Sequence, residues 1–212
     1  ADKNLINENE FNLYKEKILF LPKIWNVFAP PEILPDIELE EKNNNTVFTF
    51  CSFNNYQKIS NRTVNVWSQI LKHTNSQLLL KTSHAGDIDD LKNNILNKFI
   101  NNGVSRDQII FLKREKEIHD HLKLYNKANI ALDTFPYPGV TTSFEAIMMG
   151  VPVLTMKGFN MNSRCGESIN KNISMDELIA SDDDDYVAKA KSLIFISDKI
   201  SLTFFLGSIT QY

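Results

Sequence analysis

The feature that most constrains the fold of this chain is a regular alternation of short apolar runs with segments whose apolar residues recur at helical spacing. The apolar runs are typical of strands buried in a parallel sheet, and they cover residues 46–53, 77–81, 108–112, 130–135 and 151–156. Strands that alternate with helices pair in parallel through right-handed crossovers. The sequence therefore predicts an α/β fold with a doubly wound, Rossmann-like parallel sheet and a helical segment from Ser174 onward.

The helices expected between these strands have recognisable ends. Ser60 is a good N-cap for a helix that carries Val64, Trp67 and Ile70 on one face. A second helix is expected over residues 87–102, with Gly103 just past its end. Two more are expected over residues 116–127 and 141–149.

The first 45 residues differ in composition from the middle of the chain. Residues 1–45 are mixed in character, contain Pro22, Pro30, Pro31 and Pro35, and end in a polar run. Prolines end helices and remove donors from sheets, so we expect a strap or linker there rather than an independent core. The predicted organisation is a strap over 1–45, a nucleotide-sugar-binding domain over 46–200 and a C-terminal tail over 201–212.

Composition excludes several classes of protein. The chain has 212 residues and a formal net charge of −3, with scattered basic residues, which argues against nucleic-acid binding. No apolar run approaches the roughly 20 residues that span a bilayer, and the N-terminus lacks a secretory signal pattern. Cys51 and Cys165 form no metal or redox motif. These observations favour a cytoplasmic protein with no membrane partner.

Ligands of open parallel sheets bind at the carboxyl ends of the strands, and three loops at such ends carry polar side chains. The first loop follows the strand at 46–53 and contains Asn54, Asn55 and Lys58. A lysine there can neutralise a diphosphate, although a solvated loop lysine is the simpler interpretation. The second loop contains His119 and His121, whose spacing does not place them on one helical face as a metal pair. A capping or surface role is the alternative for both histidines.

The third loop joins the strand at 130–135 to the next helix through a turn rich in proline and glycine. Thr141, Thr142 and Ser143 open that helix, whose free N–H groups favour an anion. Glu145 lies one turn further on, on the face of Thr141, and could accept hydrogen bonds from ribose hydroxyls. The threonines could instead merely cap the helix. No dinucleotide or P-loop glycine fingerprint is present, which argues against an oxidoreductase of the NAD type.

Several of these segments together resemble a known family. The segments in question are FCSFNNYQKI at 50–59, WSQIL at 67–71, HLKLY at 121–125, LDTFPYPGVTTSFEA at 132–146 and MGVPV at 149–153. In this order and at this spacing they resemble the catalytic region of the O-GlcNAc transferase (SPINDLY-like) family, and the resemblance covers about residues 20–195. It implies the C-terminal lobe of a GT-B glycosyltransferase, in which two Rossmann-like lobes enclose a UDP-sugar.

The resemblance also implies roles for individual residues. The positions that it assigns to the UDP-sugar are Asn55, Lys58, His121, Thr141, Thr142 and Glu145. Lys58 would contact the diphosphate and act as the catalytic cation, with further donors from the two threonines. Asn55 and His121 would hold the nucleotide, and Glu145 would bind the ribose. The implied reaction is inverting transfer of GlcNAc, or a related sugar, from UDP to a protein Ser/Thr hydroxyl, without a metal or other cofactor.

Two positions depart from the family pattern. Val140 stands where many members carry a histidine, and Asn55 stands where a glutamine is common. The expected partners are a UDP-sugar, a protein or peptide acceptor, an N-terminal catalytic lobe and possibly TPR repeats. We recognise neither the N-terminal lobe nor TPR repeats in these 212 residues. We therefore expect a fragment that is inactive alone. The alternative is a non-catalytic nucleotide-binding or protein-interaction module with the same fold, which the loss of the histidine at 140 would suit.

Overall fold

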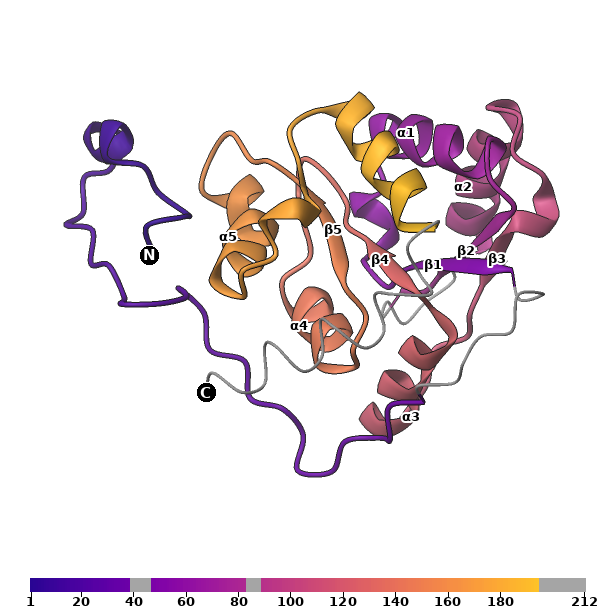
Figure 1. Ribbon diagram of the computed structural model, residues 1–212, viewed down its shortest axis with the longest axis horizontal. Helices are drawn as coiled ribbons and strands as arrows, with labels where there is room; N and C mark the ends of the chain where they lie inside the picture. Colours follow the sequence, from indigo (N-terminus) through magenta and orange to yellow (C-terminus); the bar gives the residue numbers. More distant parts are fainter. Residues whose placement is uncertain (39–46, 83–88, 195–212) are drawn as a thin grey trace.

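A computed structural model describes residues 1–38, 47–82 and 89–194 of the chain (Figure 1). Its strands are β1 (Phe48–Ser52), β2 (Ser76–Leu80), β3 (Ile109–Phe111), β4 (Ile130–Leu132), β5 (Val153–Met156) and β6 (Ile179–Ala180). Its α-helices are α1 (Asn61–Lys72), α2 (Asp89–Asn101), α3 (Ile118–Lys123), α4 (Thr141–Met148) and α5 (Cys165–Asn172), and a further helix covers 183–194. The tail expected at 201–212 lies outside the described residues.

All the described strands form one parallel sheet of six strands in the order β3-β2-β1-β4-β5-β6. The predicted doubly wound, Rossmann-like fold is therefore confirmed. From β1 the chain adds β2 and β3 on one side of that strand, and it then adds β4, β5 and β6 on the other side. Phe50 of β1 accordingly pairs with Leu78 of β2 on one side and with Ile130 of β4 on the other. In an open α/β sheet, the carboxyl ends of strands at such a reversal are where ligands bind.

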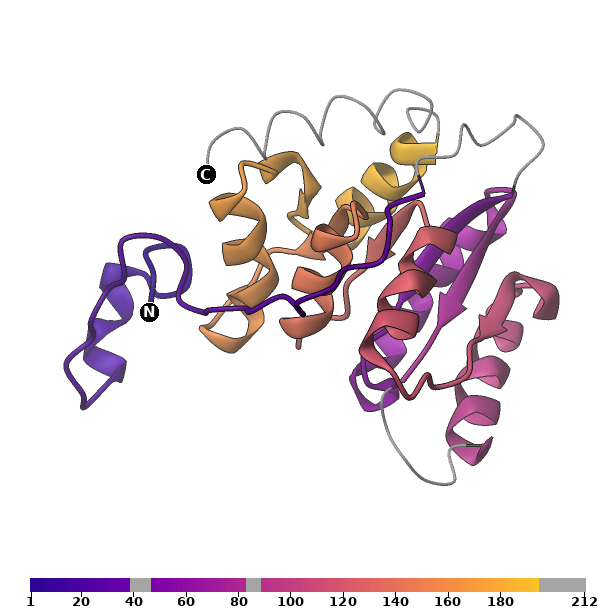
Figure 2. The same ribbon diagram turned by 90° about the horizontal axis from the view of Figure 1, so that it is seen from below.

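Helices cover both faces of the sheet, as Figures 1 and 2 show. In Figure 1, α1, α2 and the helix at 183–194 lie above the sheet, and α3 and α4 lie below it. On the first face, Trp67 of α1 and Phe99 of α2 are fully buried in the larger apolar core. On the other, Tyr125 and Phe53 belong to a second apolar cluster under α3 and α4. The large apolar area that these two layers remove from water drives formation of this fold.

The helix ends agree with the sequence-based expectations in most places. The side chain of Ser60 accepts a hydrogen bond from the backbone N–H of Thr63 at the start of α1, as predicted for an N-cap. Gly103 follows α2 with a φ of 82°, a conformation that glycine adopts without strain. Asp182 likewise accepts from the N–H of Asp185 at the start of the helix over 183–194.

The structure refines two expectations for helices. The segment from Ser174 onward is not simply helical, because β6 intervenes and pairs with β5 before the last helix begins. A strand of two residues is too short to produce a periodic signal in the sequence. The helix expected over 116–127 is also shorter, since α3 ends at Lys123 and a 3-10 turn over Leu124–Lys127 follows it. The apolar spacing of those last residues fits either kind of helix.

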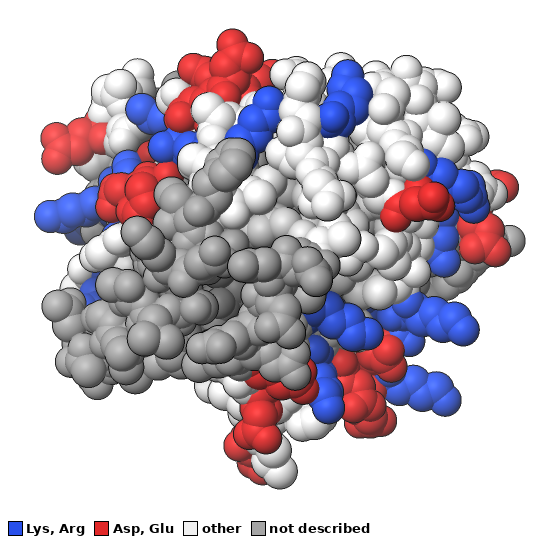
Figure 3. Space-filling view, turned by 45° about the vertical axis from the view of Figure 1, so that its right-hand side comes forward, with Lys and Arg blue, Asp and Glu red and all other residues white. Residues whose placement is uncertain are grey.

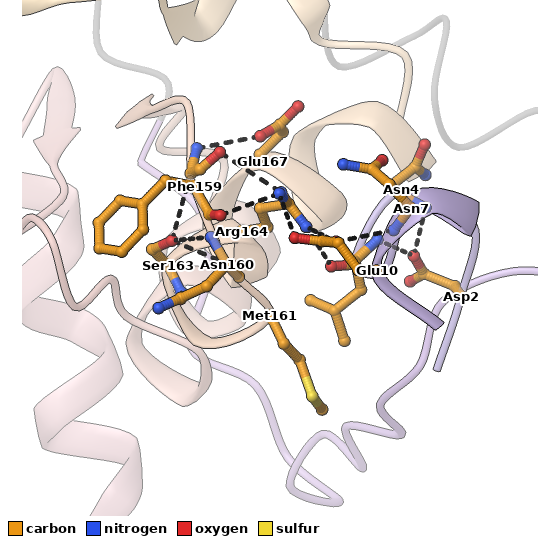
Figure 4. A network of polar contacts seen from close by, with 12 residues as sticks. Asp2, Asn4, Asn7, Glu10, Phe159, Asn160, Met161, Ser163, Arg164 and Glu167 are labelled. Atoms are coloured by element: carbon orange, nitrogen blue, oxygen red, sulfur yellow. Dashed lines mark hydrogen bonds and ion pairs between the residues drawn. The ribbon is translucent and has the colours of Figure 1, made fainter. Parts of the chain in front are cut away.

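Polar contacts hold the N-terminal segment, residues 1–25, against α5 and the turn that precedes it (Figure 4). The guanidinium of Arg164 donates to both carboxylate oxygens of Glu10, at 2.5 and 3.0 Å, and to the carbonyl of Leu5 at 3.2 Å. The buried carboxylate of Asp2 accepts from Ser168 at 2.6 Å and from the backbone of Trp25 at 3.0 Å. Residues beyond this segment run under α4 toward α3 (Figure 1).

The surface carries charges of both signs. On the face in Figure 3, lysine and arginine side chains lie among aspartate and glutamate side chains. This mixture is typical of a solvated surface rather than of a phosphate-binding stripe along a nucleic acid. Within the described ranges, no helix is long and apolar enough to span a bilayer.

Candidate functional site

The candidate site lies at the carboxyl ends of β1 and β4, where the strand order reverses. Two loops meet there, one after β1 and one between β4 and α4. The adjoining strand ends, the start of α4 and the side chain of Tyr125 help to line a small cavity there. The residues with polar side chains in its lining are Ser52, Asn54, Tyr125, Asp133, Thr142 and Ser143. The predicted position of the site at this edge of the sheet therefore coincides with a hollow lined by polar groups.

Lys58 joins the two loops. Its ammonium donates to the carbonyl of Pro138 at 3.0 Å and to the side-chain oxygen of Asn54 at 3.4 Å, and it lies 4.6 Å from the ring centre of Tyr137. Burial lowers the pKa of Lys58, and the nearby carboxylate of Asp133 opposes that change. The cation is thus fixed beside the loop that leads into α4, with partners that an incoming anion could supplement.

The two asparagines after β1 have different surroundings. Asn54 is buried, and its side-chain oxygen accepts from Lys58 and, at 3.3 Å, from Thr142. Asn55 instead caps a 3-10 turn, because its side-chain oxygen accepts from the backbone N–H of Gln57 at 3.0 Å. Asn54, which the sequence analysis placed in this loop but did not assign to the UDP-sugar, therefore connects the predicted cation to the predicted helix start. The side chain of Asn55 is only partly buried.

The N-terminus of α4 has no side-chain cap. Its N-cap residue is Val140, whose side chain cannot accept a hydrogen bond, so neither threonine caps the helix. Thr141 is exposed as the first helical residue, and Thr142 is partly buried beside Asn54. A helix start without a capping oxygen leaves its first N–H groups available to an anion, and the helix dipole favours negative charge there.

Asp133 holds the loop between β4 and α4 in place. Its carboxylate is 1% exposed and accepts from Thr134 and Gly139 backbone N–H groups at 2.9 and 2.6 Å and from the Thr155 hydroxyl at 2.8 Å. Burial raises the pKa of Asp133 to about 6, and these hydrogen bonds together with Lys58 limit the rise. All three donors belong to the scaffold of the loop, so this carboxylate acts as a brace.

His121 and Glu145 meet across α3 and α4. The imidazole Nε2 of His121 lies 3.0 Å from Oε2 of Glu145, and its Nδ1 lies 2.8 Å from the ammonium of Lys81. The hydroxyl of Tyr125 lies 3.2 Å from the same Oε2 and 3.1 Å from the carbonyl of Thr142, which joins this group to the start of α4. Lys81 is only 4% exposed.

Of the six residues predicted for the UDP-sugar, four belong to these two connected groups. Lys58 and Thr142 meet through Asn54, and His121 contacts Glu145. The side chains of Thr141 and Asn55 lie outside these contacts. The sequence analysis did not predict that Lys81 belongs to the site, because a lysine at the end of an apolar strand is usually exposed to solvent. Among the described residues, no group of three or more His, Cys, Asp or Glu side chains could hold a metal ion.

A solved structure shares this fold. A mutant of the Thermobaculum terrenum O-GlcNAc transferase superposes with a TM-score of 0.86 and 25% sequence identity, covering 100% of this chain and 41% of that one. Together with the parallel sheet and the site at its reversal point, this match defines the chain as a GT-B glycosyltransferase C-terminal lobe.

Residues 39–201 match the sequence profile of Glycosyl transferase family 41, and the chain belongs to that family. Relatives named "Probable UDP-N-acetylglucosamine--peptide N-acetylglucosaminyltransferase SPINDLY" occur in Solanum lycopersicum and Petunia hybrida. They are 33% and 34% identical to this chain over 189 and 190 residues, or 89% of it. The chain spans about 20% of the length of each of these relatives. The resemblance to O-GlcNAc transferases is thereby confirmed.

Proposed function

We propose that this lobe binds the nucleotide of a UDP-sugar for an inverting glycosyltransferase, which transfers GlcNAc from UDP-GlcNAc to Ser/Thr hydroxyls of proteins. The observation that carries the proposal is the position of Lys58, held by Pro138 and Asn54 beside the uncapped start of α4. A lysine and a helix N-terminus at one sheet edge are two independent devices that favour a diphosphate. The names of the relatives supply the sugar and the acceptor.

In this proposal the lobe stabilises the leaving group. The hydroxyl oxygen of the acceptor attacks the anomeric carbon of the sugar from the face opposite the diphosphate, and the bond from that carbon to the diphosphate oxygen breaks. The hydroxyl proton passes to water or to the departing UDP. Negative charge then grows on UDP, next to the Lys58 ammonium, the first N–H groups of α4 and the hydroxyls of Thr141 and Thr142. Donors already oriented toward developing charge stabilise a transition state more than water does.

The remaining contacts to the nucleotide are assigned by the same proposal. Glu145 accepts from the ribose hydroxyls, and His121 and Asn55 lie against the nucleotide. No metal takes part, because Lys58 and α4 neutralise the diphosphate and the carboxylate of Asp133 is occupied by its three donors. A cytoplasmic setting is part of the same proposal, because Cys51 and Cys165 lie far apart in the sequence and make no metal or redox motif.

We further propose that the acceptor and part of the sugar site come from a second, N-terminal lobe, with residues 1–45 as the strap between lobes and TPR repeats as a possible further partner. The support is that this chain covers 41% of the solved transferase and one sheet accounts for all its described strands. Inverting transfer requires donor and acceptor in near-attack geometry, which a cleft between two lobes provides.

A non-catalytic nucleotide-binding or protein-interaction module is the second candidate, favoured by one residue. Val140 supplies no side-chain donor at the start of α4, where many members of the family carry a histidine. Such a module would bind UDP without transferring sugar.

A transfer assay separates these candidates. The chain is incubated with labelled UDP-GlcNAc and a Ser/Thr-rich peptide pool, with and without the N-terminal lobe of the tomato relative. We expect transfer only with the added lobe, and its loss in Lys58→Ala. Robust transfer by the chain alone would contradict the two-lobe proposal, and UDP binding without transfer in either arm would favour the non-catalytic module. Transfer from a GDP-sugar but not from UDP-GlcNAc would contradict the choice of nucleotide.

A further inference from the structure

Lys81 is a buried cation to which the proposed function assigns no role. It follows β2, its backbone N–H donates to the carbonyl of Ser52 at 3.2 Å, and its side chain is covered. Burial lowers the pKa of Lys81, whereas the carboxylates of Glu145 and Glu115 raise it and Arg114 lowers it further. A buried ammonium is costly unless it is paired, so its partner matters.

The partner of Lys81 is the ring of His121, and this contact fixes where the ring carries its proton. An ammonium has three donors and no acceptor, so Nδ1 of His121 must accept from Lys81 across their 2.8 Å contact. Nε2 then carries the proton and donates to Oε2 of Glu145 at 3.0 Å. The three side chains thus form a line from an ammonium through a neutral imidazole to a carboxylate.

Aromatic rings pack beside Lys81 and His121. The ring of Phe53 lies 6.0 Å from the Lys81 ammonium and 5.9 Å from the His121 ring, and the Tyr125 ring lies 5.8 Å from that of His121. The Tyr125 hydroxyl also approaches Oε2 of Glu145. His121 and Tyr125 both contact Oε2 of Glu145, so within the described part of the chain Oε1 of Glu145 has no protein donor.

We propose that Lys81 is a positioning residue for the ribose: through the neutral ring of His121 it holds the Glu145 carboxylate so that Oε1 accepts from the ribose hydroxyls. This inference rests on the proposed function, in which Glu145 binds the ribose. Without the ammonium, Nδ1 of His121 loses the donor that selects its tautomer, and the ring can present a lone pair to Glu145. Two acceptors would then face each other and the carboxylate would turn away.

The first test measures how well the full chain distinguishes UDP from 2′,3′-dideoxy-UDP, which lacks both ribose hydroxyls. A hydrogen bond to a charged group corresponds to about 10- to 150-fold in affinity, so the unaltered chain should prefer UDP by a factor in that range. Lys81→Met should reduce the preference to less than about 3-fold, as Glu145→Gln should, and the double variant should lose no more than either single one. Lys81→Arg keeps a cationic donor and should retain most of the preference.

The second test reads the tautomer of His121 without any ligand. Nitrogen NMR of the imidazole should show the proton on Nε2 in the unaltered chain and a changed tautomer population in Lys81→Met. Lys123→Met is the matched control, because Lys123 is exposed on the same helix as His121 and should change neither readout. Thermal unfolding of each variant shows whether it is folded.

The outcomes separate the two proposals. If the unaltered chain distinguishes the two nucleotides and folded Lys81→Met does so equally well, the role of Lys81 is contradicted while the nucleotide site stands. A proton on Nδ1 in the unaltered chain would also contradict it. If the unaltered chain binds neither nucleotide, the proposed function itself is contradicted, and the role of Lys81 with it.

Discussion

At the residue scale, the site depends on a few side chains whose ordinary partners are already close. Lys58 donates to a backbone carbonyl and to one amide oxygen, and both partners are neutral. A phosphate oxygen would be a stronger acceptor for the same ammonium, because it carries a negative charge that attracts the cation, whereas the carbonyl and amide oxygens are neutral. In the proposed function, Lys58 is thus already held in place before a nucleotide binds.

Replacing Lys58 by alanine should therefore weaken UDP binding without unfolding the chain. A charge-assisted contact contributes about 1.5–3 kcal/mol, so the Kd for UDP should rise roughly 10- to 150-fold. Calorimetric titration of both proteins measures the change, and Lys123→Ala serves as the control on an exposed lysine. Equal affinity in Lys58→Ala and the unaltered chain would contradict the assignment of this residue.

Asp133 should make stability depend on pH in a particular direction. Its pKa is raised from 3.8 to about 6, so the folded chain binds more protons than the unfolded chain between those values. Its contribution to stability is fully present below pH 3.8 and is lost as pH rises through about 6. The loss is on the order of 1–3 kcal/mol in the free energy of unfolding.

Asp133→Asn should remove this part of the pH dependence, because the amide does not titrate. Urea unfolding at a series of pH values from 4 to 7 measures the slope, and Asp184→Asn is the control on an exposed carboxylate. If both variants and the unaltered chain lose the same free energy of unfolding over this range, the raised pKa of Asp133 is wrong.

At the scale of single elements, the start of α1 is tied to the loop that leads into α4. The Ser60 hydroxyl accepts from the N–H of Thr63 and lies 3.2 Å from the carbonyl of Phe135, to which the Thr63 hydroxyl also donates at 2.9 Å. A helix cap on one face of the sheet thus restrains the loop that carries the candidate site.

Ser60→Ala should lower the free energy of unfolding by about 0.5–2 kcal/mol, the usual cost of losing a serine N-cap. Thr63 keeps its contact with Phe135, so UDP affinity should change little. Chemical unfolding and calorimetry measure the two quantities, and Ser192→Ala, an exposed serine within a helix, is the control and should change stability by no more than about 0.5 kcal/mol. A loss as small in Ser60→Ala would contradict the role of the cap.

Elements were predictable from the sequence where local chemistry determines them. The apolar runs and the caps at Ser60 and Gly103 gave five of the strands and most helices, because spacing and backbone preference are local properties. β6 was missed, since two residues held by pairing with β5 leave no local signal. The contacts of Lys81 and Asn54 were not predicted for a related reason, because they involve neighbours distant in the sequence, His121 and Thr142.

At the scale of the whole molecule, the contact between Arg164 and Glu10 joins segments that are 154 residues apart in the sequence. Arg164 is buried, and its hydrogen bond lowers the pKa of Glu10. Because the same guanidinium also donates to the carbonyls of Leu5, Gly158 and Phe159, it holds the N-terminal segment and the loop before α5 together.

Arg164→Ala should release the N-terminal segment and leave the nucleotide site intact. Limited proteolysis should cleave within residues 1–38 at least several-fold faster than in the unaltered chain, because exposed backbone is cut more readily than docked backbone. UDP affinity should remain within about 2-fold. Arg106→Ala is the control on an exposed arginine. Unchanged cleavage in Arg164→Ala would contradict this role, and so would a large loss of UDP affinity.

Calorimetric titration of UDP into the 212-residue chain, with and without EDTA, tests the central claim most directly. In the proposed function, the site at the carboxyl ends of β1 and β4 uses a lysine and a helix start in place of a metal, so we expect saturable binding at a single site that is unchanged by the chelator. An absence of binding would contradict the assignment of this edge of the sheet as a donor-nucleotide site. Binding that EDTA abolishes and Mg²⁺ or Mn²⁺ restores would contradict its metal-independent chemistry.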